Sequence, residues 1–116
     1  MYDNMTHVSN DCGYFIFCFR LLSGTVICAW GEDGAAAMTV GGDVTTSLIY
    51  APHKVVDTLG AGDTFNAATV YALSNRADVT SAIKFGCFVA GTKCGGVGLK
   101  KIKGLQNRLR EFCCTE

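Results

Sequence analysis

The clearest alternation of hydrophobic and polar positions lies between residues 63 and 95 and has the period of an α-helix. In DTFNAATVYALS, before a break at Asn75, the residues sharing one face are Phe65, Ala68, Thr69, Ala72 and Leu73. A second helix is predicted to open at Asp78 and to end at Gly95-Gly96, with a stripe of Val79, Ala82, Ile83, Gly86 and Ala90. A last helical stretch, LQNRLREF, spaces Leu105, Leu109 and Phe112 on one side.

The part of the chain between residues 24 and 58 has the pattern of short strands. TVICAW is rich in strand-forming residues, GEDG is a turn, and AAAMTV and SLIY are predicted strands joined through Gly41-Gly42. Pro52 fixes a bend, and VVDT is a brief extended piece. Residues 1–23 follow neither period and stay unassigned. These elements predict an α/β fold in which a short sheet segment precedes helices over residues 24–116.

Length, composition and charge restrict what the chain can be. A chain of 116 residues with 49% hydrophobic residues supports one domain with a core. Ten basic residues balance ten acidic ones, so no general attraction to nucleic acid or to an anionic membrane is expected. The apolar stretch from Tyr14 to Trp30 is interrupted at Arg20 and Ser23-Gly24, and is too short to span a membrane. We therefore expect neither nucleic acid nor a membrane as partner.

The cysteines and histidines bear on location and metals. Seven cysteines form an odd set, and several lie inside apolar runs, so we expect reduced core thiols and a cytoplasmic protein. The sequence contains no CxxC pair, and His7 and His53 are isolated. This spacing argues against a structural metal.

The stretch VVDTLGAGDTFNA (55–67) carries the candidate chemistry. Gly60, Ala61 and Gly62 let the backbone approach a ligand and present unpaired amides at a helix start, which favours a phosphate. The carboxylate of Asp63 could accept a proton from an attacking hydroxyl group. The alternative is an ordinary turn followed by a helix cap. The dinucleotide fingerprint is excluded because Phe65 stands where a third glycine is needed, and no lysine follows as in a Walker loop.

The longer motif DTLGAGDTFNA resembles the C-terminal signature of ribokinase-like (PfkB) carbohydrate kinases, and it matches every fixed position of the D-T-x-G-A-G-D core. VICAWGEDGA and AIKFGCFVAGTKCGGVGL are similar to the corresponding parts of fructokinases in this family, which use ATP to convert fructose to fructose 1-phosphate. The resemblance covers about residues 24–99. It implies the C-terminal, nucleotide-binding portion of a ribokinase-like fold.

The resemblance also implies roles for individual residues. Asp63 would be the general base, and Gly60, Ala61 and Gly62 the anion hole. ATP would bring Mg²⁺ with it, and its adenine would lie in a shallow site formed by Gly31, Gly34, Pro52, Phe65, Cys87 and Ala90. A monovalent cation, K⁺ in the first instance, would bind at Asp57 and Thr58 with carbonyl groups of the 91–98 loop.

Plainer interpretations exist for several of these residues. Cys87 and Ala90 lie on or beside the buried helical stripe and would be core residues in most proteins, and Asp57 could cap a turn. The basic run of Lys93, Lys100, Lys101 and Lys103 is more typical of a solvated face than of a phosphate site.

The sequence departs from the family pattern in its N-terminal part. The half that grips the sugar in these kinases and their Asn-x-x-Glu motif are not found here. Three hypotheses stay open: an ATP-dependent ketose kinase, a truncated and inactive nucleotide-binding fragment, and a nonfunctional fragment that pairs with another chain through an exposed strand edge. The expected partner is a nucleotide, with a sugar only if the other half is supplied.

Overall fold

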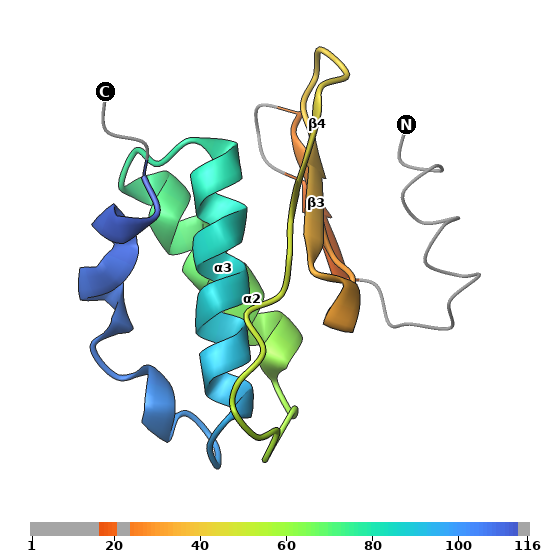
Figure 1. The fold of residues 1–116 in the computed structure, drawn as a ribbon. Coiled ribbons are helices and arrows are strands. Elements are labelled where there is room, and N and C mark those ends of the chain that lie inside the picture. Colours follow the sequence, from red (N-terminus) through yellow and green to blue (C-terminus); the bar gives the residue numbers. More distant parts are fainter. Residues whose placement is uncertain (1–16, 21–23, 114–116) are drawn as a thin grey trace.

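The computed structural model describes residues 17–20 and 24–113, which form three layers (Figure 1). A four-stranded antiparallel sheet has the order β1-β2-β3-β4, with β1 (Phe17–Arg20), β2 (Val26–Ala29), β3 (Ala35–Met38) and β4 (Val44–Ser47). The helices α2 (Ala61–Ser74) and α3 (Val79–Cys94) form the middle layer, and the 3-10 helices η2 (Lys100–Ile102) and η3 (Leu105–Glu111) lie beyond them. A third 3-10 helix, η1 (Gly31–Asp33), connects β2 to β3 at the end of the sheet.

The sheet differs in extent from the sequence prediction. The strand β1 lies in the segment that the sequence left unassigned, and the remainder of that segment, including His7, is outside the described residues. The predicted strand SLIY was wrong, because β4 runs from Val44 to Ser47 instead. Ser47 pairs with Ala35, the first residue of β3, so no partner strand continues beside residues 48–50. That stretch is consequently released from the sheet and passes over α3.

The sheet and the helices share a core. Ile27 of β2 and Ala35 and Ala37 of β3 are buried against Phe65 of α2 and against α3. The alternating burial of β3 is the pattern expected for a strand with one face on a helix layer. On the opposite face of the sheet, a small cluster contains Val26, Cys28, Trp30, Ala36 and Met38.

The first two predicted helices are present within two residues of their expected starts, and the last predicted helical stretch forms the 3-10 helix η3. Asp78 caps α3, since its Oδ1 accepts a hydrogen bond from the Ser81 amide at 2.7 Å. Gly86 lets α3 approach α2 closely, because a Cβ at this position would collide with Thr69 and lie 2.8 Å from Phe65. In the described ranges, no helix combines the length and apolar character needed to cross a membrane.

The cysteines follow the expectation only in part. Cys87, Cys94 and Cys113 are free thiols. Cys28, which is fully buried in β2, is in a disulfide, so the expectation of reduced core thiols was wrong for this residue.

Candidate nucleotide-binding site

The glycine signature forms the tight start of α2. Gly60 has φ 80°, a left-handed conformation that favours glycine, and α2 begins at the next residue. The amide of Ala61 donates to the carbonyl group of Thr58 at 3.1 Å. The carbonyl group of Gly60 accepts hydrogen bonds from both the amide and the hydroxyl of Thr64, each at 2.9 Å. The loop and the first helical turn therefore form one hydrogen-bonded unit.

The first turn of α2 has the polarity that an anion requires. Gly62 and Asp63 lie in this turn, where helix geometry leaves amide groups without an acceptor one turn earlier. The helix dipole adds a partial positive charge at the same end. Asp63 is exposed, so its carboxylate is open to a reactant from solvent. The turn can thus bind a phosphate with a proton acceptor beside it.

A cavity of about 420 Å³ lies next to this turn, within the usual size range of small-molecule sites. Its walls come from the end of β2 and η1, from residues 49–55, from the signature loop, and from the pocket-facing side of α3. The lining residues are Ala29, Gly31, Glu32, Gly34, Ile49, Tyr50, Ala51, Pro52, Val55, Thr58, Ala61, Gly62, Phe65, Cys87, Ala90, Gly91 and Cys94.

The structure brings most of the predicted site residues to this one cavity. All six residues of the predicted adenine site line it, namely Gly31, Gly34, Pro52, Phe65, Cys87 and Ala90. Thr58, Ala61 and Gly62 line it too, whereas Asp57, Gly60 and Asp63 lie outside its walls. The cavity is consequently continuous with the glycine loop at the start of α2.

Sequence reasoning missed one wall of the cavity, residues 49–51. Gly91 of α3 allows this wall, because a Cβ there would collide with the carbonyl group of Tyr50. The Tyr50 ring packs edge-on against Phe88 and Phe112, with ring centroids 5.8 Å apart in both pairs. Aromatic residues in a sequence indicate packing, but Phe88 and Phe112, the partners of Tyr50, lie far from it along the chain.

The two thiols in the cavity are part of an apolar wall. Burial raises the pKa of Cys87 to about 11, and a hydrogen bond with Ser47 opposes this shift. Burial also raises the pKa of Cys94, while the charge of Lys93 lowers it. Both side chains are therefore neutral near pH 7 and suit a flat, uncharged ligand surface better than nucleophilic chemistry.

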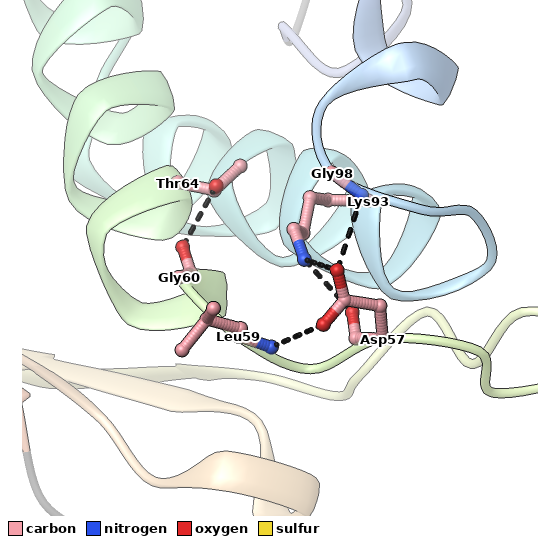
Figure 2. Close-up of polar contacts among 6 residues, drawn as sticks. All are labelled: Asp57, Leu59, Gly60, Thr64, Lys93 and Gly98. Atoms are coloured by element: carbon pink, nitrogen blue, oxygen red, sulfur yellow. Dashed lines mark hydrogen bonds and ion pairs between the residues drawn. The ribbon is translucent and has the colours of Figure 1, made fainter.

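Beside the cavity, the buried side chain of Lys93 contacts the partly exposed Asp57 (Figure 2). Lys93 Nζ donates to the main-chain carbonyl oxygen of Asp57 at 2.8 Å and lies 3.3 Å from Asp57 Oδ2. The Asp57 carboxylate also accepts the amides of Gly98 and Leu59, at 3.1 and 3.0 Å. These two amides, and to a smaller degree Lys93, lower the pKa of Asp57.

The interpretation of Lys93 as part of a solvated basic run was wrong. Its side chain is 1% exposed, whereas Lys100, Lys101 and Lys103 are exposed. Helical spacing from Ile83, Gly86 and Ala90 leads to position 93, and this was the signal available in the sequence.

Comparison with known proteins decides the family. The family model described as pfkB family carbohydrate kinase matches residues 20–102. The chain belongs to this family. Solved structures share the fold: a probable sugar kinase protein from Rhizobium etli CFN 42 aligns with 95% of this chain and 30% of its own length, at TM-score 0.65 and 22% identity. Ribokinase from Thermotoga maritima aligns with 71% of this chain and 27% of its own, at TM-score 0.57 and 26% identity.

Among curated pfkB relatives, ketohexokinase from Mus musculus is 49% identical over 78 residues, which are 67% of this chain and 26% of the mouse protein. The 5-dehydro-2-deoxygluconokinase of Geobacillus kaustophilus (strain HTA426) is 34% identical over 65 residues, or 56% of this chain and 19% of that protein. The chain thus spans about a quarter or less of these relatives. The predicted resemblance and the ribokinase-like α/β fold are confirmed.

The metals implied by the pfkB family were compared with the described residues. Within residues 17–20 and 24–113, no group of three or more His, Cys, Asp or Glu side chains is placed to hold a metal ion. At the predicted K⁺ position, the main-chain oxygen and Oδ2 of Asp57 are already engaged by Lys93. Binding of a monovalent cation at Asp57 and Thr58 stays a prediction.

Proposed function

We propose that this chain binds ATP, with the purine in the 420 Å³ cavity and the phosphates at the start of α2. The observation that carries the proposal is the continuity of an apolar cavity with an amide-rich helix start. Phe65, Pro52 and Ala90 offer flat or small apolar surfaces, and Gly62 lies at the boundary between the two parts. A nucleotide has the same division into an uncharged ring and a charged phosphate chain.

We further propose that the chain is the nucleotide-binding part of a kinase that converts fructose to fructose 1-phosphate. In this reaction a sugar hydroxyl oxygen bonds to the γ-phosphorus, the bond from that phosphorus to the bridging oxygen breaks, and ADP leaves. Asp63 would take the hydroxyl proton, and the amides of the first turn would stabilise charge on the transferred group. Mg²⁺ bound to the nucleotide would neutralise further phosphate charge. Fructose is proposed from the similarity to mouse ketohexokinase.

A second candidate is nucleotide binding without phosphoryl transfer. It is favoured by the composition of the cavity, whose lining includes the six residues assigned to the purine together with Ala61 and Gly62 of the predicted anion hole, and no residue assigned to a sugar. Transfer requires a sugar hydroxyl held in line with the γ-phosphate, which is a separate positioning task.

Calorimetric titration with ATP and ADP in magnesium buffer tests the binding proposal. We expect saturable binding by the wild-type chain and a loss of about tenfold or more in Gly62→Val, because the larger side chain would block close backbone approach. Gly41→Val is the matched control, since Gly41 lies in the exposed β3–β4 turn with only Thr39 Oγ1 near a Cβ, at 4.0 Å. A folded wild-type chain that binds neither nucleotide would overturn the proposal.

A further inference from the structure

The side chain of Lys93 carries a charge in a place that water hardly reaches. It is 1% exposed, and a buried ammonium is costly unless it is paired and hydrogen-bonded. Both needs are met by one residue, Asp57, through its main-chain carbonyl oxygen at 2.8 Å and its Oδ2 at 3.3 Å. Lys93 does not line the cavity, so it does not belong to the nucleotide wall itself.

The contact joins the C-terminal end of α3 to the signature loop. The carbonyl group of Cys94 accepts the amides of Val56 and Asp57, at 2.7 and 3.1 Å. Asp57 Oδ2 accepts the amide of Gly98, which lies in the turn after α3. The backbone before the glycine signature is consequently held by the end of α3 at Cys94 and by the following turn at Gly98, in addition to Lys93.

From Asp57 the constraint continues toward the phosphate site. Asp57 Oδ1 accepts the amide of Leu59 (Figure 2). The carbonyl group of Thr58 accepts the amide of Ala61, the first residue of α2. The position of residues 57–59 therefore fixes how Gly60 turns and where the first amides of α2 point. The purine wall, in contrast, is formed by residues such as Phe65 and Cys87 that pack in the main core.

We propose that Lys93 is a positioning residue for phosphate binding: it acts through Asp57 to hold the glycine loop and has no contact with the nucleotide. This inference rests on the proposed function, which supplies the ligand. The contacts of Lys93 supply the mechanism. Loss of the ammonium would leave the carbonyl group and the carboxylate of Asp57 without their shared partner, and the loop would lose one of its attachments to α3.

The experiment compares two ligands that share the purine, ADP with magnesium and adenosine, by calorimetric titration. In Lys93→Met we expect ADP to bind about tenfold or more weakly while the affinity for adenosine stays within about twofold, because only the phosphate contacts depend on the loop. Lys93→Arg should recover much of the ADP affinity by restoring a charged donor. Lys84→Met removes an exposed lysine of the same helix and should match the wild type.

Equal weakening of ADP and adenosine, or no change in either, would overturn the inference. Should Lys93→Met not fold, Asp57→Asn tests the other side of the contact: it keeps an oxygen for Leu59, removes the carboxylate charge, and should show the same preferential loss of ADP.

Hydrogen–deuterium exchange gives a readout without nucleotide. Faster exchange is expected at residues 57–62 in either variant, with residues 81–90 unchanged, and a loop that exchanges as in the wild type contradicts the inference. A wild-type chain that binds neither ligand would instead overturn the proposed function.

Discussion

At the scale of single residues, the cavity and its surroundings contain groups with contrasting environments. Asp63 is exposed at the start of α2, Cys87 is buried, and Lys93 is buried although it is charged. The sequence motif predicted that Asp63 lies at a helix start, because a helix start is a local property. Helical spacing indicated a buried position at Lys93, but its partner Asp57 lies 36 positions away and no local pattern identifies it.

Replacement of Asp63 tests the role of the general base. In a coupled assay with ATP, fructose and Mg²⁺, Asp63→Asn should lower kcat by about 10²–10⁴-fold, because the amide cannot accept the hydroxyl proton as a carboxylate does. The Kd for ADP should change little, since Asp63 does not line the cavity. Undiminished turnover in Asp63→Asn would contradict the assignment, and a wild-type chain that binds ATP without turnover would favour the second candidate function.

The thiols of the cavity report on ligand binding. Cys94 lines the cavity and Cys113 lies outside it, so MgADP should slow iodoacetamide alkylation of Cys94 by about tenfold or more at concentrations well above Kd, and should leave Cys113 unaffected. Cys87 should react slowly throughout, because a pKa of about 11 leaves only about one part in a thousand as thiolate at pH 8. Mass spectrometry of the labelled peptides measures all three rates. Equal protection of Cys94 and Cys113 would argue against binding in this cavity.

At the scale of elements, the decisive packing is between α2 and α3. Helical periodicity predicted both helices, and Asp78 predicted the start of α3, because these signals are contained in short windows of sequence. The end of β4 was predicted less well, because it depends on where β3 begins. Helix contact at Gly86 connects this packing to the site, since Phe65 touches that glycine and also lines the cavity.

A methyl group at Gly86 should separate the two helices. Gly86→Ala is expected to destabilise the chain by about 1–3 kcal/mol, because the Cβ would overlap with Thr69 and press on the Phe65 ring. Denaturant unfolding measures this change, and Gly41→Ala in the exposed turn serves as a control with the same chemical substitution. Stability equal to that of the wild type would show that the helices repack around the methyl group without cost.

At the scale of the whole molecule, the sequence motif identified the family, and the fold shows how the separate segments of the predicted site meet. The six predicted purine-site residues come from η1 and its neighbouring glycine, from the Pro52 bend, and from α2 and α3. The resemblance supplied their roles, because composition and periodicity alone would have assigned Cys87 and Ala90 to the core. The 49–51 wall was not predictable in this way, since no local pattern links Tyr50 to Gly91.

The attachment of Tyr50 to the aromatic cluster has a consequence for how such a site changes over evolutionary time. Phe112 follows η3, in the outer layer, and still contacts the ring that supports one wall of the cavity. A mutation at Phe112 would therefore alter the shape of the cavity without changing any residue that lines it. Substitutions in the outer helical layer can thus change this site over evolutionary time, as can substitutions in the signature motif.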